Sequence, residues 1–331
     1  MISGIKPMLS FELRRNPRIA ARPENFDNFI PEGYDGVLII SADFELAWAW
    51  RYAKKLTNPK EEAEQYARQA RRNIPLILDL CEQYNIPVTW ATVGHLFLDR
   101  CDRKEGGLPH PELKRLAHFE NNFWKFEGSD WFEHDPCTSV EENDAWYAPD
   151  LIRKIIDSPV GHEIGCHTFS HIDCRDGVCP EAILRDELRA CQEAAGRFGI
   201  QLESFIFPGH TLGNFKTLKE CGYTAIRTNY ANVIGYPEMD EYGLWRFPVT
   251  AEMTMNPRLS KKYNVYRFQK IIELTLKHRA VANYWFHPSL PGEDIPELFE
   301  NLFRFINKYR DRLWIGTMKD YTKHLNEHCL A

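Results

Sequence analysis

The amino-acid sequence predicts an α/β protein built as one closed or nearly closed barrel of mostly parallel strands. Short apolar runs alternate with helical stretches along most of the chain, as in a parallel sheet that is covered on both faces. About eight such runs occur, which favours a barrel over an open sheet. The 331 residues, 44% of them hydrophobic, are enough for one large barrel with its own core.

The expected elements follow in order. Residues 1–35 form an irregular N-terminal arm, and the barrel domain spans 36–331. The first strand is 36–44 (GVLIISADF), a largely apolar run that is typical of a buried strand. A helix over 61–84 leads to a second strand, which Pro87 begins. The expected strands are 36–44, 87–94, 162–168, 203–208, 224–228, 244–250, 281–288 and 312–317, and the later helices are 181–198, 214–221, 264–278 and 296–309.

Residues 99–150 interrupt this rhythm and predict a loop insertion. In a barrel, an insertion that follows a strand lies on the active-site face. The segment contains Trp124, Trp131, Trp146 and Tyr147. These aromatic side chains could stack on sugar rings, or they could pack the loop against the barrel. The sequence leaves both interpretations open.

Charge and composition restrict the partners. The net charge is −6 with no long run of one sign, and the basic stripe that marks nucleic-acid binding is missing. We find no apolar run typical of a signal peptide or a membrane span. Nine scattered cysteines suit a reducing compartment. We therefore expect a cytoplasmic protein with neither nucleic-acid binding nor membrane insertion, of unknown oligomeric state.

Acidic and imidazole groups follow three of the expected strands. Asp43 and Glu45 are two residues apart, so in a strand both carboxylates point to the same side. His167 and His171, at a strand-to-helix junction, can share one metal ion with a carboxylate and leave positions open for water and a carbonyl oxygen. His287 follows an apolar strand and could act as a general acid. Each group also has a purely structural interpretation, as a capping carboxylate or a hydrogen-bonded buried histidine.

Three cysteines lie near the histidine pair. Cys166, Cys174 and Cys179 match no spacing of a closed structural metal site. We interpret them as small buried hydrophobic residues rather than as ligands.

The segment HEIGCHTFSH (162–171) resembles the second motif of the polysaccharide deacetylase family, the NodB homology domain of carbohydrate esterase family four. YNIPVTWATVG, ECGYTAIRT and WIGTMKDYTKHL are similar to further family segments in the same order, over about Gly36 to Leu325. The resemblance implies a distorted, NodB-like (β/α) barrel of seven or eight mostly parallel strands. It also implies metal-dependent hydrolysis of the N-acetyl group of an amino sugar. Zinc is the expected ion, with nickel or cobalt as alternatives.

Carried over residue by residue, the resemblance makes Asp43 the base and Glu45, His167 and His171 the metal ligands, with His287 as the general acid. The family commonly has two adjacent aspartates in its first motif, whereas here Phe44 separates two acids. This Asp-x-Glu pattern is similar to that of allantoinase-like members. The reverse roles of the two acids remain open.

The third motif departs more seriously, because Phe205 to His210 (FIFPGH) lacks the family's base-holding arginine. We expect Arg246, from a neighbouring strand, to take that role. The residues predicted to contact the substrate are Pro208, Gly209, His210 and Trp285. The family's fourth motif supplies an aspartate that orients the general-acid histidine, here His287, and the sequence identifies no counterpart of that aspartate.

The predicted function is therefore deacetylation of a polysaccharide, lipopolysaccharide or glycoconjugate precursor. The expected cytoplasmic location favours a small carbohydrate, nucleotide-linked or lipid-linked, over an external polymer. Two alternatives remain: an allantoinase-like or other amide hydrolase on the same scaffold, and a non-catalytic carbohydrate-binding member that has lost its metal.

Overall fold

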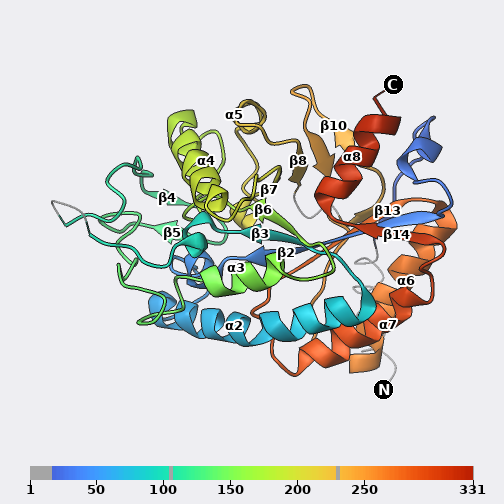
Figure 1. Cartoon of the computed structure of the whole chain (residues 1–331), viewed down its shortest axis with the longest axis horizontal. Helices are drawn as coiled ribbons and strands as arrows, with labels where there is room; N and C mark the ends of the chain where they lie inside the picture. The colour runs from blue at the N-terminus through green and yellow to red at the C-terminus, as the bar shows by residue number, and fades with distance from the viewer. Residues whose placement is uncertain (1–16, 104–106, 229–231, 331) are drawn as a thin grey trace, which may run out of the picture.

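The computed structural model describes residues 17–103, 107–228 and 232–330, and residues 1–16 of the expected N-terminal arm lie outside this part. Its centre is a curved ten-stranded sheet in the order β10-β11-β8-β7-β6-β3-β2-β13-β12, with β14 also paired to β2 (Figure 1). Only the β10–β11 pair is antiparallel. The strands of this sheet are β2 (Gly36–Phe44), β3 (Thr89–Thr92), β6 (Glu163–Cys166), β7 (Ser204–Ile206), β8 (Ala225–Arg227), β10 (Glu238–Met239), β11 (Trp245–Phe247), β12 (Ala251–Glu252), β13 (Val281–Phe286) and β14 (Leu313–Gly316).

The predicted α/β class and mostly parallel sheet are confirmed. Within the described residues, however, no pairing joins β10 to β12, so the sheet is an open half-barrel rather than a closed one. Both end strands are only two residues long, which leaves little backbone to pair across the gap. The prediction of seven or eight strands missed these short end strands.

Strand β2 is the centre of the sheet. All nine of its residues are buried. One of its edges pairs with β13, and the other pairs first with β14 and then with β3. Because its neighbours are parallel, the carboxyl end of β2 lies beside the carboxyl ends of β3 and β13. Polar residues that follow these strands therefore gather at one rim.

The helices surround the strands (Figure 1). The longest, α2 (Pro59–Tyr84), has Pro59 at its first position. Asn85, the residue that follows it, has the left-handed conformation that commonly terminates helices. The other helices are α3 (Pro149–Ile156), α4 (Glu181–Gly196), α5 (Phe215–Glu220), α6 (Lys261–His278), α7 (Asn301–Asn307) and α8 (Met318–His328), and α2 spans Pro59–Tyr84. No helix in the described parts of the chain is both long enough and apolar enough to cross a bilayer.

Two short segments complete the N-terminal part. Strand β1 (Arg18–Ile19) pairs with β9 (Val233–Ile234), and a single helical turn, η1, covers Phe26–Phe29. The expected irregular arm is therefore tied to the domain at residues 18 and 19.

Among its described residues, the only named strands in the insertion over 99–150 before α3 begins are β4 (Phe119–Glu120) and β5 (Lys125–Phe126), which pair with each other. Trp131, Trp146 and Tyr147 are at most 2% exposed. Their rings form a core for the loop, so the packing interpretation holds for these three. Trp124, at 6% exposure, also borders the site described next.

Candidate active site

Three side chains converge at the rim where β2 and β6 end. Glu45 Oε2 lies 3.2 Å from His167 Nε2 and 3.0 Å from His171 Nε2. All three side chains are buried, and their possible ligand atoms lie within 4.8 Å of one another. The structure thus brings together the three residues predicted as metal ligands, which we call the rim triad.

The hydrogen bonding of His167 suits a metal ligand. Its Nδ1 lies 2.8 Å from the carbonyl oxygen of Ile206, which can only accept, so Nδ1 carries the ring proton. In the neutral ring Nε2 then has no proton, and its lone pair faces a Glu45 oxygen. A divalent cation between these acceptors would satisfy both, and histidine ligands commonly donate their other N–H to a carbonyl. The rim triad therefore fits the ion that the family resemblance implies.

The turn that carries the two histidines is held from both sides. Thr168 and His171 both have φ of 58°, in the left-handed region that few non-glycine residues adopt. Ser170 donates its backbone N–H and its hydroxyl to Glu187 on α4, at 2.8 and 2.6 Å. The buried Arg51 donates to the Ser170 carbonyl at 2.8 Å. Sequence reasoning missed Glu187 and Arg51, which lie outside every motif.

Asp43 is paired with a buried arginine. Both carboxylate oxygens accept from Arg227, at 2.6 and 2.7 Å, and the guanidinium also donates to Ser41. Burial alone would raise the pKa of Asp43, but the charges of Arg227, His167 and His287 and the hydrogen bonds from Arg227 together outweigh burial, and the pKa is lowered. Asp43 is therefore an ionised, rigidly oriented carboxylate.

The expectation that Arg246 would hold Asp43 was wrong. Arg246 is paired in register with Ile226, and Arg227 with Phe247. Because successive residues of a strand point to opposite faces, Arg246 projects away from Asp43. Its guanidinium lies over the ring of Phe215 on α5. The sequence signal that could have identified Arg227 is its position within the segment ECGYTAIRT (220–228), where an arginine follows an apolar pair.

His287 follows β13 and completes the rim. Its Nε2 lies 3.2 Å from Glu45 Oε1, and its Nδ1 lies 3.7 Å from Glu252 of β12. Burial lowers the pKa of His287, but the negative charge of Glu45 and the contact with Glu252 dominate and raise it to about 10. Glu252 is thus a carboxylate beside His287 Nδ1, where the sequence identified no acid.

A pocket of about 620 Å³ opens onto these groups. Asp43, Glu45, His171 and His287 form its floor, and the predicted substrate-contacting residues Gly209, His210 and Trp285 line it. Pro208 does not belong to the described pocket lining. It is buried, and its carbonyl accepts a hydrogen bond from the Thr211 hydroxyl. The expectation for Pro208 was therefore wrong.

The loop after β7 shapes one wall of the pocket. Gly209 and His210 both have positive φ, 52° and 57°. A Cβ on Gly209 would lie 2.7 Å from the indole of Trp124, so only glycine permits this close approach. The His210 ring meets Trp285 edge to face at 5.0 Å. Burial lowers the pKa of His210 to about 4, so this ring is neutral near neutral pH.

The three cysteines near the histidine pair are all buried. Burial raises the pKa of Cys174 and of Cys179. They form no group with metal-ligand geometry within the described chain. Their interpretation as small buried hydrophobic residues agrees with this burial.

An α/β half-barrel with acids and histidines at its strand ends defines a class of candidate hydrolases, and the comparisons with known proteins specify it further. The model of the polysaccharide deacetylase family matches residues 64–226. Residues 64–226, a little under half of the chain, are therefore similar to the polysaccharide deacetylase family, as the motifs indicated. No curated protein matches the sequence.

Solved structures share the fold over almost the whole chain. A Mycobacterium smegmatis protein assigned as a polysaccharide deacetylase has a TM-score of 0.64 at 16% identity, covering 96% of this chain and 97% of its own. A probable polysaccharide deacetylase from Pseudomonas aeruginosa PAO1 gives 0.61 at 14%, covering 91% and 94%. The PuuE allantoinase gives 0.62 at 14%, covering 93% and 95%. At these identities the likeness establishes the fold.

Proposed function

We propose that this protein is a metal-dependent deacetylase that hydrolyses the N-acetyl group of an amino sugar. The observation that carries the proposal is the convergence of the rim triad, the Asp43–Arg227 pair and His287 on one pocket. The family model supports a hydrolase that acts on amide bonds of carbohydrates.

Glu45, His167 and His171 would hold the cation, for which zinc is our first choice and nickel or cobalt the alternatives. When bound, a divalent ion supplies Lewis-acid polarisation of the amide carbonyl and lowers the pKa of water.

The chain's own side chains then handle the protons. Asp43, ionised and held by two hydrogen bonds from Arg227, accepts a proton from the attacking water. The hydroxyl adds to the acetamide carbon and the carbon–nitrogen bond breaks. His287, whose Nε2 lies 3.2 Å from Glu45 Oε1 beside the pocket, donates a proton to the departing nitrogen. The products are acetate and a free amino sugar.

The pocket walls support a sugar as the substrate. Trp50, Phe123, Trp124 and Trp285 line the pocket together with Asn122 and Lys55. Aromatic faces suit the C–H faces of a sugar ring, and the polar groups can bind its hydroxyls. The volume of about 620 Å³ is in the usual range for small-molecule sites.

One alternative retains a specific basis. The Asp43-x-Glu45 pattern resembles that of allantoinase-like members, and the PuuE allantoinase shares the fold. Hydrolysis of allantoin or a cyclic imide, without acetate release from sugars, would favour that activity. A non-catalytic member is less well supported, because Glu45 and Arg227 supply the groups that the altered first and third motifs lack.

The test is an acetate-release screen over nucleotide-activated and free N-acetyl sugars, with and without chelator. We expect release from at least one sugar, its loss on chelation, and its recovery with added zinc. His171→Ala should abolish release and reduce bound metal, whereas His328→Ala, at the exposed end of α8, should change neither. Full activity of a folded His171→Ala variant would refute the proposal.

A further inference from the structure

A second cluster of metal-ligating side chains lies within and beside the insertion, away from the rim triad. His95 comes from a single helical turn, η3 (Gly94–Phe97), and Cys101, His110 and Asp135 come from the insertion. One possible ligand atom from each lies within 4.8 Å of the other three. The four residues are at most 9% exposed. We call this group the insertion cluster.

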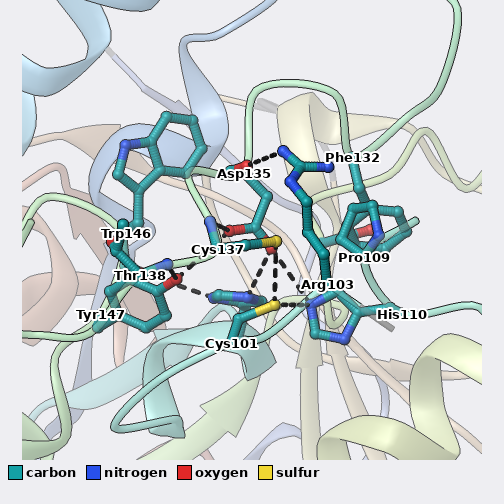
Figure 2. A network of polar contacts seen from close by, with 12 residues as sticks. Cys101, Arg103, Pro109, His110, Phe132, Asp135, Cys137, Thr138, Trp146 and Tyr147 are labelled. Atoms are coloured by element: carbon teal, nitrogen blue, oxygen red, sulfur yellow. Dashed lines mark hydrogen bonds and ion pairs between the residues drawn. The ribbon is translucent and has the colours of Figure 1, made fainter. Parts of the chain in front are cut away.

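The distances within the insertion cluster are close to those of a coordination shell. Asp135 Oδ2 lies 3.1 Å from His95 Nε2 and 3.3 Å from His110 Nε2. Cys101 Sγ lies 3.2 Å from His110 Nε2, and Figure 2 shows Cys101, His110 and Asp135 facing one another. Ligand atoms around a tetrahedral zinc ion are about 3.3–3.8 Å apart, given bonds of about 2.0–2.3 Å. If the ligand atoms moved apart by roughly a few tenths of an ångström, the cluster would therefore accommodate the ion.

The proton positions of His95 point to a cation. Its Nδ1 lies 3.2 Å from the carbonyl oxygen of Trp146, and its Nε2 lies 3.1 Å from Asp135 Oδ2. Since the carbonyl only accepts, Nδ1 carries the proton of the neutral ring. Nε2 then presents a lone pair to a carboxylate oxygen, and two buried acceptors in contact repel each other. A metal ion between them removes the repulsion, as would a second proton on the ring.

Asp135 is oriented for such a role. Its other oxygen, Oδ1, accepts the backbone N–H of Cys137 at 2.9 Å, which turns Oδ2 toward the insertion cluster. The thiol of Cys137 flanks the site, with its sulfur 3.4 Å from that of Cys101, well beyond the roughly 2.05 Å of a disulfide. His110 and Cys137 both have φ of 47°. Such backbone strain persists where surrounding interactions hold it, commonly at functional sites.

We propose that His95, Cys101, His110 and Asp135 bind a structural zinc ion that is separate from the ion of the rim triad. One thiolate, two imidazoles and one carboxylate form a borderline-soft set that suits zinc. Four protein ligands close the tetrahedron and leave no position for substrate, as in structural sites. The ion would fasten the insertion to the barrel, where His95 also contacts Trp48 and Tyr147.

Zinc-edge X-ray absorption tests the proposal, because the rim triad offers only nitrogen and oxygen ligands. We expect zinc-supplemented wild-type protein to hold two ions per chain and to show a zinc–sulfur path near 2.3 Å, roughly one sulfur per two ions. His171→Ala should hold one ion with about one sulfur around it. If no sulfur path appears in either protein, the proposal is wrong, whatever the outcome of the acetate screen.

Single variants and cysteine mapping identify the ligands. Cys101→Ser should lose the sulfur path and one ion, whereas Cys221→Ser, outside the insertion cluster, should keep both. Because Cys101→Ser could fail to fold, wild-type protein is also alkylated under native conditions and mapped by mass spectrometry. We expect Cys101 to react only after chelation. Labelling of Cys101 that is unaffected by chelation, or a disulfide between Cys101 and Cys137, would overturn the proposal.

Discussion

Replacing Arg227 by methionine removes the guanidinium that holds Asp43 but keeps much of its volume. The two hydrogen bonds, 2.6 and 2.7 Å long, join side chains that are 1% and 6% exposed. Removing one partner of a buried pair leaves an uncompensated charge and costs about 3–5 kcal/mol of unfolding free energy. Arg246→Met is the matched control, because Arg246 lies over the ring of Phe215 and, within the described residues, is in no ion pair. It should cost about 1 kcal/mol or less.

The cost of Arg227→Met should depend on pH. In the folded protein the pKa of Asp43 lies below its ordinary value of 3.8, because Arg227 together with His167 and His287 outweighs the effect of burial. Its contribution to stability is therefore present above pH 3.8 and is lost as the pH falls through the lowered pKa. Without Arg227 burial raises the pKa, and protonation of Asp43 relieves the unpaired charge. The variant should consequently be less impaired in acid than at neutral pH.

Urea unfolding followed by tryptophan fluorescence measures these differences, with metal-saturated protein at about pH 7 and about pH 5. A double variant, Arg227→Met with Asp43→Asn, removes the orphaned charge and should regain at least about 1 kcal/mol over Arg227→Met alone. The reasoning is refuted if Arg227→Met costs no more than Arg246→Met. It is also refuted if Asp43→Asn brings no recovery.

Two further predictions concern the pocket and the general acid. Gly209→Ala should raise KM several-fold with little change in kcat, because the added Cβ would displace Trp124 from the pocket wall. Gly161→Ala is the control, because Gly161 also has a positive φ but has open space around it. This variant should leave KM unchanged and cost about 1–2 kcal/mol of unfolding free energy. In NMR titrations, filling the rim triad with zinc should lower the pKa of His287 from about 10, because the ion neutralises the charge of Glu45 that raises it. An unchanged His287 pKa on zinc addition would contradict the ligand role of Glu45.

The elements that the sequence predicted best are those with a continuous local signal. Residues 36–44 were expected as a strand and form one, because a strand buried on both faces needs an unbroken apolar run. The helix expected over 61–84 is observed at Pro59–Tyr84, and its buried residues include Ala63, Ala67, Ala70 and Ile74 at helical spacing. The histidine pair was identifiable for the same reason, since His167 and His171 lie in one short turn.

The choice between Arg227 and Arg246 depended on strand register, which is not local. Arg246 is the middle residue of β11 and Arg227 is the last residue of β8, and these two short strands are neighbours in the sheet. A difference of one residue decides which face a side chain occupies. Glu252 was missed for a related reason, since it belongs to a two-residue strand without a periodic pattern. The insertion cluster was missed because His95 and Asp135 are 40 residues apart, with no ligand-spacing motif between them.

The insertion contributes to the candidate active site as well as bordering it. Trp131 donates its indole N–H to the Ser170 hydroxyl at 2.9 Å, and Asn121 donates to Asp173 at 2.7 Å. Both contacts fall on or beside the turn that carries His167 and His171. A segment with so little regular structure needs other constraints to keep these contacts in place.

Phe169 links the rim triad to the insertion cluster. It lies between His167 and His171 in the sequence, yet its ring meets the rings of His95 and His110 at 5.6 and 5.3 Å. Its carbonyl also accepts the backbone N–H of His95 at 2.9 Å. The same turn therefore presents two histidines to the pocket and one aromatic ring to the insertion cluster. We therefore expect a change in the packing of the insertion cluster to act directly on the backbone that positions His167 and His171.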